Sequence, residues 1–259
     1  MIEISSAANP RFKLLARLLG SGRERRKSGL TVLDGVHLVQ AYREHVGSPE
    51  ELVINRSALQ NADVMRAVEP DSARALVLSD ALYAQLSTVS TPTGIIALVR
   101  VPPTLSPGTD IASCVVLEDV QDPGNLGSIL RSAAASGTRE VLLTSGCANA
   151  WSPRVLRAGM GAHFALRLYE HCDVAAFASG YRGRLLATVR RAPASVFDTD
   201  LRGEVGLMFG NEGGGLSDAL AALAHDRISI PMPGVAESLN VAAAAAICLF
   251  ERVRQLSIR

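Results

Sequence analysis

One stretch near the end of the chain decides its fold: Ile228-Ser-Ile-Pro-Met-Pro-Gly-Val-Ala-Glu-Ser-Leu-Asn-Val-Ala-Ala-Ala-Ala-Ala-Ile-Cys-Leu-Phe-Glu251. It begins as a short apolar strand. Pro231 and Pro233 then fix φ and remove two backbone donors, so no regular element can cross this point. Gly234 allows a backbone conformation that residues with side chains resist. The stretch therefore predicts a strand, a rigid turn and a long helix, in that order.

The helix after the turn, expected over residues 239–256, carries its polar residues at one end. It is apolar on nearly every face from 241 to 250, which indicates burial on several sides. Ser238 is placed to cap it. Glu237, Ser238 and Asn240 gather at the end where unpaired backbone N–H groups also collect. This arrangement predicts a binding site at the strand-to-helix junction.

The composition is that of a globular protein with a large aliphatic core. The chain has 259 residues, 48% of them hydrophobic and 4% aromatic, and a formal net charge of +1. This length fits one large domain or two modest ones. The near-zero net charge does not exclude a nucleic-acid binder, because the positive charge of such a protein can be local.

The cysteines and histidines show no pattern typical of a metal site. The cysteines are widely spaced and include no C-x-x-C pair: Cys114, Cys147, Cys172 and Cys248. Buried free thiols are therefore expected rather than metal ligands or disulfides. The five histidines form no H-x-x-x-H cluster. We predict that the protein has no metal site.

Nothing in the sequence indicates a membrane protein. The N-terminus lacks the apolar core and the small-residue cleavage site of a signal peptide. The longest apolar run, residues 241–250, is too short to span a bilayer. A cytoplasmic protein without a membrane partner is expected.

Positive charge concentrates in residues 1–30, which hold seven Lys or Arg against two Glu. The first part has helical spacing, with apolar residues on one side and basic residues on the other. A second basic run follows the Gly20-Ser-Gly22 break and contains Arg23, Arg25, Arg26 and Lys27. This run is either a solvated loop or a patch that contacts phosphates, and the sequence leaves both open.

From residue 30 onward, short apolar segments alternate with helical ones, which predicts an α/β fold. The expected strands are 31–33, 51–54, 75–78, 94–99, 113–117, 140–143, 185–189, 205–209 and 227–230. The expected helices are 36–43, 58–68, 80–86, 126–136, 153–158, 174–181, 216–223 and 239–256. The strands of the second half suit a parallel sheet covered on both faces. A proline-rich linker at 100–110 predicts domains of residues 1–105 and 106–259.

In open α/β sheets, ligands bind beyond the carboxyl ends of the strands, and the junction over 117–131 is polar there. Asp122-Pro-Gly makes a turn, and Asn125 is expected to cap the following helix. Arg131 should lie back over Gly127 and Ser128, because helical side chains lean toward the N-terminus. Its guanidinium would then reach toward the Asn125 loop. The alternative is a capped surface helix with a solvated arginine.

A second junction, residues 207–217, places Asn211 and Glu212 among four glycines directly after an apolar strand. Glycines let a ligand approach the backbone closely. The segment has neither the Lys-Ser/Thr ending of a phosphate-binding P-loop nor the G-x-G-x-x-G order of a dinucleotide fingerprint. A flexible loop is the alternative to a binding site.

Together with the opening stretch, these junctions resemble a known family. Asn125-x-Gly-x-x-x-Arg131, Gly210-Asn-Glu-Gly-x-Gly-Leu-Ser217 and Ile230-Pro-Met-x-Gly-x-x-Glu-Ser-Leu-Asn240 look like the three motifs of the SpoU/TrmH-type RNA ribose 2′-O-methyltransferases of the SPOUT superfamily. The likeness covers roughly residues 113–255. The N-terminal half resembles the substrate-binding domain often fused ahead of it, with loose matches at Asn9-Pro10, the basic helix, Asp34-Gly35 and Thr91-Pro-Thr-Gly94.

The resemblance implies a SPOUT fold, in which a parallel sheet contains a deep trefoil knot, an exception to the usual rule of unknotted chains. It implies that S-adenosylmethionine binds in the knot. By position, the cofactor contacts fall at Gly210, Ile230 and Leu239, with Thr188 as an addition after its strand. It also implies a homodimer whose active site is built across the interface, with the last helix in it.

The resemblance further assigns the catalytic residues Arg131, Asn125, Glu212 and Asn240. Arg131 would lie nearest the ribose hydroxyl and the phosphate, and it could come from the other subunit. It would stabilise negative charge or act as a base, although a guanidinium is normally always protonated. Glu212 and the two asparagines would orient Arg131 and the ribose. The chain departs from the family in the Glu-Gly-Gly-Gly run of motif two and at Ala242.

Several functions remain open at this point. The favoured one is 2′-O-methylation of 23S ribosomal RNA, because of the extra N-terminal domain. A tRNA 2′-O-methyltransferase is an alternative, although small tRNA-directed relatives have only short extensions. A catalytically silent RNA-binding or ribosome-assembly module is another, although a pure binder has no need of all four catalytic residues. A dinucleotide-binding dehydrogenase is a remote alternative, because this sequence lacks the glycine fingerprint of such enzymes and the acidic residue downstream of it.

Overall fold

A computed structural model describes residues 1–87, 92–108 and 110–257, and the chain in it forms two compact units. Unit 1 is Met1–Pro103 together with Trp151–Phe164, and unit 2 is Thr104–Ala150 together with Ala165–Arg259. The sequence placed the segment 151–164 in the second domain, whereas its contacts lie in unit 1. The Thr31 hydroxyl donates to the Trp151 carbonyl at 2.7 Å, and the Phe164 ring packs edge-on against Tyr42 at 5.3 Å.

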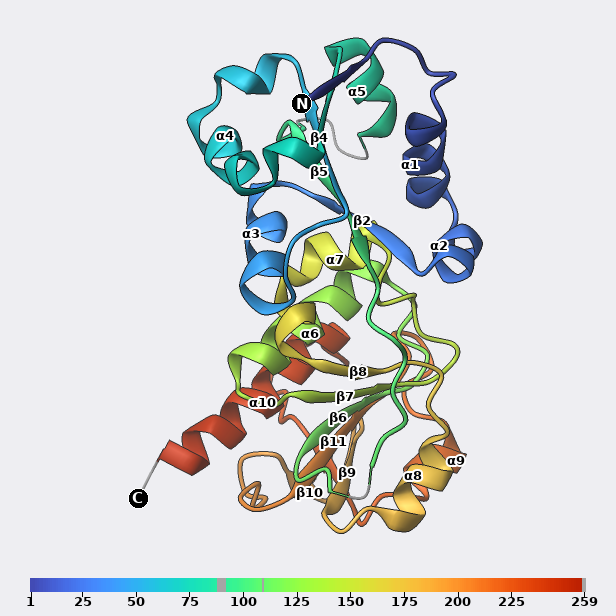
Figure 1. The fold of residues 1–259 in the computed structure, drawn as a ribbon. Coiled ribbons are helices and arrows are strands. Elements are labelled where there is room, and N and C mark those ends of the chain that lie inside the picture. Colours follow the sequence, from blue (N-terminus) through green and yellow to red (C-terminus); the bar gives the residue numbers. More distant parts are fainter. Residues whose placement is uncertain (88–91, 109, 258–259) are drawn as a thin grey trace. The chain divides into compact units, whose positions relative to one another are not determined.

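Unit 1 contains a five-stranded mixed sheet with the order β1-β4-β3-β5-β2 (Figure 1). Its strands are β1 (Ile2–Ile4), β2 (Leu30–Asp34), β3 (Glu51–Asn55), β4 (Ala75–Leu78) and β5 (Ile95–Arg100). β4 runs parallel to β1 and β3, whereas β5 runs antiparallel to β2 and β3. The sequence predicted four of these strands. It missed β1, which has three residues and only one buried side chain, so no alternation could be recognised.

The α-helices of unit 1 are α1 (Pro10–Gly20), α2 (Gly22–Ser28), α3 (Val36–His45), α4 (Ala62–Val68), α5 (Asp80–Leu86) and α7 (Pro153–Gly159). The apolar face of α1 is buried as its spacing predicted, with Phe12, Leu15 and Leu18 in the core. The basic run forms α2 rather than a loop. Ser21 caps it, and Gly29 ends it with φ of 65°. Arg25, Arg26 and Lys27 lie in the last turn, where they are favoured by the helix dipole.

Unit 2 contains a seven-stranded sheet with the order β10-β12-β9-β11-β6-β7-β8, in which the named strands pair in parallel. Its strands are β6 (Cys114–Leu117), β7 (Glu140–Leu143), β8 (Arg167–Tyr169), β9 (Arg184–Thr188), β10 (Ala194–Ser195), β11 (Val205–Phe209) and β12 (Asp226–Ser229). The predicted parallel sheet is therefore confirmed. The two edge strands, β8 and β10, were missed because each is too short to show a pattern.

Helices cover both faces of this sheet (Figure 1). They are α6 (Pro123–Ala135), α8 (Val174–Gly180), α9 (Asp218–Ala221) and α10 (Val241–Ser257). Phe177 of α8 joins a buried cluster with Val116 and Met208 of the sheet, while α10 packs along α6. Because β6 and β11 are neighbours in register from Gly206–Cys114 to Phe209–Leu117, the loops that follow their carboxyl ends meet.

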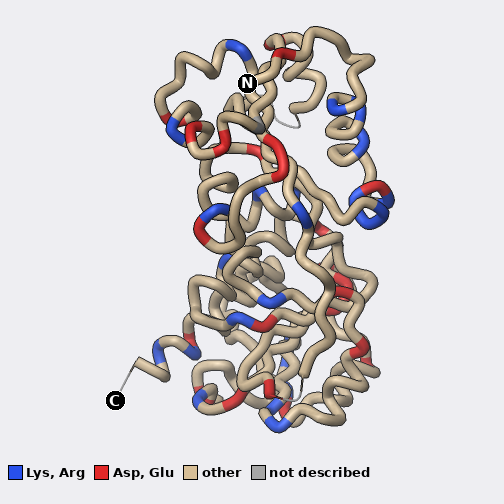
Figure 2. The backbone as a smooth tube through the Cα atoms, viewed as in Figure 1, with Lys and Arg blue, Asp and Glu red and all other residues tan. Residues whose placement is uncertain are grey.

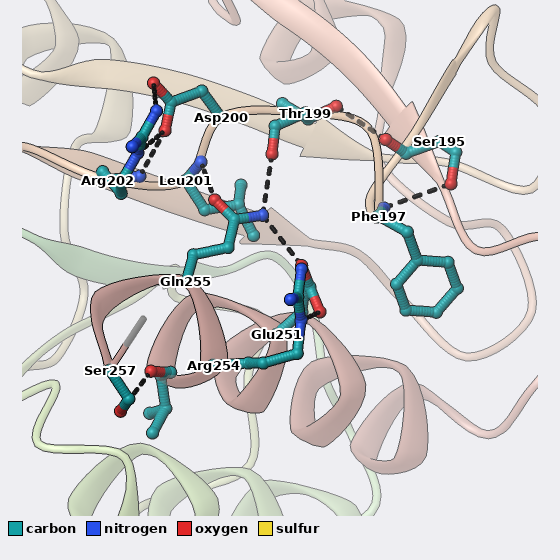
Figure 3. Close-up of polar contacts among 11 residues, drawn as sticks. Ser195, Phe197, Thr199, Asp200, Leu201, Arg202, Glu251, Arg254, Gln255 and Ser257 are labelled. Carbon is teal, nitrogen blue, oxygen red and sulfur yellow. Dashed lines mark hydrogen bonds and ion pairs between the residues drawn. The ribbon is translucent and has the colours of Figure 1, made fainter. Parts of the chain in front are cut away.

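The long helix α10 is less buried in one chain than its apolar sequence predicted. Cys248 and Leu249 are buried, but Phe250 and Leu256 are 48% and 50% exposed. Its C-terminal end is held by Gln255 (Figure 3). The Gln255 amide accepts from the Leu201 N–H at 2.8 Å and donates to the Thr199 carbonyl at 3.0 Å and to Glu251 at 2.8 Å. This clamp fixes α10 to the loop after β10.

The cysteines are free thiols, with Cys114 and Cys248 buried and the other two half-buried. Burial raises the pKa of Cys114 to about 12, an effect that the Tyr181 hydroxyl opposes. Among the described residues, no helix is both long and apolar enough to cross a membrane.

Candidate active site

Polar side chains from three distant parts of unit 2 form one chain of hydrogen bonds. The Asn240 side chain donates from Nδ2 to Asn125 Oδ1 at 2.8 Å. Asn125 donates in turn from its own Nδ2 to Glu212 Oε1 at 3.1 Å. These residues come from the three sequence motifs and follow β12, β6 and β11 respectively. The fold thus brings together three of the four side chains that the sequence assigned to catalysis.

Asn125 is free for this role because another residue caps α6. The helix begins at Pro123, and the Asp122 side chain accepts from the Asn125 N–H at 2.7 Å. The prediction that Asn125 is the cap was wrong by one turn: Asp122 takes the cap position, and proline suits the first helical position because it needs no donor there. The Asn125 amide is therefore available to both Glu212 and Asn240.

A similar shift occurs at the start of α10. Asn240, not Ser238, caps this helix: its Oδ1 accepts from the Ala242 N–H at 2.8 Å and the Ala243 N–H at 3.3 Å. Because the amide oxygen is held by the helix, its Nδ2 points as a donor to Asn125. Ser238 instead lines a neighbouring cavity. Gly234 also differs from expectation, because it does not have the positive φ that would require glycine.

Glu212 is the acceptor at the end of the hydrogen-bond chain. Besides Asn125, it accepts from the backbone N–H groups of Asp122, at 3.1 Å to Oε1, and Gln121, at 3.3 Å to Oε2. Partial burial acts to raise the pKa of Glu212, but the hydrogen bonds from Asn125 and the backbone outweigh it, so the pKa is lowered. The lowered pKa favours the ionised form of the carboxylate, which accepts all three hydrogen bonds.

The loop of motif two is an ordered turn rather than a flexible loop. The Asn211 side chain accepts from the N–H groups of Gly213 at 2.9 Å and Gly214 at 3.0 Å, and donates to the Asp119 carbonyl at 2.8 Å. The Asn211 and Gly215 backbones also bond to each other. A Cβ at Gly210 would overlap the Gly215 backbone, so glycine is required there. The turn presents Glu212 to the α6 loop.

A cavity of about 380 Å³ lies beside this turn. All four residues that the sequence assigned to the cofactor line it: Thr188, Gly210, Ile230 and Leu239. Glu212 lines it as well, which links the cavity to the hydrogen-bond chain. Its volume is within the range of small-molecule sites, roughly 300–1,000 Å³.

The residues of the cavity fit S-adenosylmethionine. Ile230, Leu239 and Met232 offer apolar surface to a flat heterocycle, while the exposed Ser238 hydroxyl can bond to a ribose or an amino acid moiety. Gly210 and its turn bring backbone groups to the wall of the cavity without intervening side chains.

Sequence reasoning missed two arginines at the cavity. Arg190 and Arg191 follow β9 directly and line the cavity, and Arg190 donates to the Gly213 carbonyl at 2.8 Å. The sequence could have indicated them, because they follow the strand that ends at Thr188, a predicted cofactor residue, and ligands bind beyond the ends of such strands. Arg190 thereby ties the loop after β9 to the motif-two turn.

Arg131, the fourth predicted catalytic residue, takes no part in these described contacts. It is exposed on α6, and it belongs neither to the lining of the cavity nor to the hydrogen bonds described for Asn125, Glu212 and Asn240. The predicted path of its side chain over Gly127 and Ser128 stays a prediction.

The predicted RNA-contacting residues of α2 do not share one environment. Figure 2 shows the basic residues along α1 and α2 of unit 1. Arg23, Arg26 and Lys27 are exposed. Arg25 is only 9% exposed, and its guanidinium donates to the Leu18 carbonyl at 2.6 Å, so it joins α2 to α1. Arg25 is thus a structural residue, unlike the other three. Thr91, in the loose N-terminal match, lies outside the described residues.

Within the described part of the chain, no group of three or more His, Cys, Asp or Glu side chains is arranged to hold a metal ion.

Comparisons with known proteins agree with this geometry. Residues 112–250 match the SpoU rRNA Methylase family, and residues 9–97 match the MRM3-like substrate binding domain. The chain is 28% identical to the 23S rRNA (guanosine(2553)-2′-O)-methyltransferase RlmP of Bacillus subtilis (strain 168), over 96% of this chain and 98% of that protein.

Solved structures are similar over the whole length. A crystal structure of an RNA 2′-O ribose methyltransferase superposes with a TM-score of 0.85 at 32% identity, covering 98% of this chain and 99% of that one. The SpoU methyltransferase AviRb from Streptomyces viridochromogenes, in complex with the cofactor AdoMet, gives a TM-score of 0.83 at 28% identity, covering 96% and 99%.

Proposed function

Because this chain belongs to the SpoU rRNA methylase family, we propose that it methylates a ribose 2′-hydroxyl of 23S ribosomal RNA with S-adenosylmethionine as donor. The observation that carries the proposal is the hydrogen-bond chain from Asn240 through Asn125 to Glu212 at the edge of a cavity that suits this cofactor. The reaction would take place in the cytoplasm.

The chemistry divides between cofactor and protein. Bound S-adenosylmethionine supplies a methyl group already activated by the sulfonium charge. The residues of this chain must align the ribose hydroxyl and stabilise the charge that develops when its proton leaves. Glu212, ionised and bonded to Asn125, orients the amides that face the ribose. Arg131 contributes the positive charge that stabilises the oxyanion, and the hydroxyl proton passes to a water molecule, because a guanidinium is not a base in its usual form.

We further propose that the active protein is a homodimer with a knotted C-terminal unit. Two apolar side chains of α10 support a partner subunit: Phe250 and Leu256 are 48% and 50% exposed. A partner subunit would bury apolar side chains that the single chain leaves in water. In such a dimer Arg131, which lies outside the cavity of its own chain, acts at the site of the other subunit.

Ribosomal RNA is favoured over tRNA because the similarity extends through both units. The relative named for 23S rRNA matches 96% of this chain, and unit 1 has its own match to a substrate-binding domain. A silent RNA-binding module is disfavoured, because such a module has no use for a cofactor-sized cavity bordered by an oriented carboxylate.

The test is methyl transfer to 23S rRNA by the purified protein with labelled cofactor, followed by mapping of the 2′-O-methyl position. Arg131→Ala is expected to bind cofactor and RNA but to lose at least about tenfold in rate, the equivalent of 1.4 kcal/mol. Arg139→Ala is the matched control. Arg139 is exposed and directly precedes β7, so it lies at the amino-terminal edge of the sheet, opposite the edge that carries the site. Wild-type rates for Arg131→Ala would refute its assignment. No methylation of 23S rRNA would refute the proposed substrate.

A further inference from the structure

Unit 1 contains a cavity of its own, with a volume of about 790 Å³. It lies where β2 leads into α3. Side chains of the 34–40 segment, of α4 and its cap, and of α7 surround it, and all of them belong to unit 1. This cavity is separate from the one beside Glu212, and the methyl-transfer chemistry makes no use of it.

Two carboxyl groups line this cavity: that of Asp63, which is exposed and paired with Arg66, and that of Asp34. Asp34 is half-buried, and the Thr93 hydroxyl donates to its Oδ1 over a long 3.5 Å. Burial raises the pKa of Asp34, while Arg157 and the Thr93 hydroxyl oppose the rise. An ionised carboxylate can accept about four hydrogen bonds. Asp34 therefore keeps capacity for donors from a ligand.

The remaining walls are apolar or carry donors. Val64 is buried, and the Met160 side chain is 42% exposed at the edge of the cavity. The Asn61 amide oxygen caps α4 by accepting from the Asp63 N–H at 2.9 Å, which leaves its Nδ2 as a donor. Two guanidiniums, those of Arg66 and Arg157, also line the cavity.

This combination fits a nucleobase better than a phosphate group alone. The half-buried Asp34 carboxylate would repel a buried phosphate, whereas apolar walls with a few polar groups suit a flat heterocycle. Single-stranded RNA is recognised in this way, through splayed bases read along their hydrogen-bonding edges. Arg66, which is exposed and pairs with Asp63, lies where a phosphate that flanks the base would meet it.

Among the bases, guanine complements Asp34 best. Its Watson–Crick edge presents two adjacent N–H donors, from N1 and the exocyclic amine, to a single carboxylate. Uracil presents one N–H between two carbonyl oxygens, which a carboxylate would repel. Cytosine and adenine present one amine donor beside a ring nitrogen acceptor.

We infer that this cavity holds one unpaired guanine of the substrate RNA, with Asp34 accepting hydrogen bonds from its Watson–Crick edge. The inference rests on the proposed function in that the ligand is RNA. It adds a specificity site in unit 1 to the catalytic site of unit 2.

The test measures binding of the full-length protein to fluorescent nine-nucleotide RNAs by anisotropy. Each probe carries one guanosine, inosine, cytidine, adenosine or uridine at the centre of eight uridines. Wild type is expected to bind the guanosine probe about tenfold more tightly than the all-uridine probe, a typical value for one bidentate contact. Inosine, which lacks the exocyclic amine, is expected to fall between them.

Asp34→Asn is expected to lose the preference for guanosine, because an amide places a donor opposite a donor. Glu44→Gln removes the same charge from an exposed site on α3 outside the cavity and should keep it. Arg66→Ala, at an exposed rim position, should weaken binding of every probe by a similar factor and keep the preference.

Equal affinity for all probes, no measurable binding of any of them, a preference for another base, or an Asp34→Asn variant that retains the guanosine preference would each overturn the inference. Calorimetry with S-adenosylmethionine and the rRNA methylation assay on the same preparations separate the two proposals. Methylation of 23S rRNA without a guanosine preference removes only the base-binding site. Failure of both cofactor binding and methylation removes the proposed function itself.

Discussion

Substituting Glu212 by Gln tests whether the ionised carboxylate organises the site. Glu212 accepts three hydrogen bonds, two at Oε1 from Asp122 and Asn125 and one at Oε2 from Gln121. Glutamine keeps the shape but replaces one oxygen by an NH₂ group. In one orientation the NH₂ faces the Gln121 N–H. In the other it faces both the Asp122 N–H and the Asn125 amide. At least one donor therefore loses its acceptor.

The size of the effect follows from this count. A hydrogen bond to a charged group contributes about 1.5–3 kcal/mol, and an ordinary one about 1 kcal/mol. Glu212 is exposed, so water can replace part of what is lost, and the lower values apply. We expect Glu212→Gln to reduce the free energy of unfolding by about 1–2 kcal/mol. We expect the rate of methyl transfer to fall by about tenfold, because Asn125 loses the acceptor that orients it.

The effect also has a pH dependence with a definite sign. The pKa of Glu212 is lowered in the folded state, so the wild-type carboxylate contributes stability that is fully present above its unfolded pKa of about 4.3. That contribution is lost as the pH falls through the lower folded value. The glutamine variant has no such group, so the stability difference between the two proteins should shrink below about pH 4.

Thermal and urea unfolding between pH 3 and pH 8 measure the stability difference, and methyl transfer at saturating cofactor measures the rate. Glu204→Gln is the matched control, because Glu204 is an exposed carboxylate just before the amino end of β11, whereas Glu212 follows the carboxyl end of the same strand. A Glu212→Gln protein with the stability and the rate of wild type would refute the view that this carboxylate orients Asn125.

Three further substitutions test the other structural claims. Gly210→Ala forces a Cβ onto the Gly215 backbone, so it should destabilise the protein by about 3 kcal/mol and abolish cofactor binding, as measured by calorimetry. Gly234→Ala is the control, because a Cβ there meets no atom within 4 Å; it should retain wild-type stability and cofactor binding. Gln255→Ala removes the clamp on α10 (Figure 3) and should lower the free energy of unfolding by about 1–2 kcal/mol, with exposed Gln60→Ala as the neutral comparison. Replacing Arg23, Arg26 and Lys27 together by Gln should weaken RNA binding and flatten its salt dependence with cofactor affinity unchanged; an unchanged salt slope would mean that this patch does not touch phosphates.

The parallel sheet of unit 2 could be predicted because its inner strands are buried on both faces. Strands such as Cys114–Leu117 and Val205–Phe209 are buried along their whole length, and a run of apolar residues between turn signals is enough to identify them. The edge strands could not be found in this way. β8 and β10 have three and two residues, and their pairing depends on neighbours that are distant in sequence.

The site residues could be named from the motifs, but their local roles could not. Both Asn125 and Ser238 have the side chains of helix caps, and each is followed by a helix. The structure gives the caps to Asp122 and Asn240 instead, because a cap is chosen by where the backbone turns, and tertiary contacts decide this. The consequence is functional: Asn125 is freed to bond to Glu212, and Asn240 is fixed so that its amide donates to Asn125.

Two observations that the sequence could not connect have one physical explanation. Arg131 is exposed and lies outside the cavity of its own chain, although the motif that contains it also supplies Asn125 to the site. Two apolar side chains of α10, Phe250 and Leu256, are exposed, and this helix packs along the one that carries Arg131. If a second copy of the chain covers α10, the same association that buries these side chains would bring an arginine to each cavity from outside. A site completed in this way would stay inactive in the monomer, so the rate per subunit should fall on dilution below the dissociation constant of the dimer.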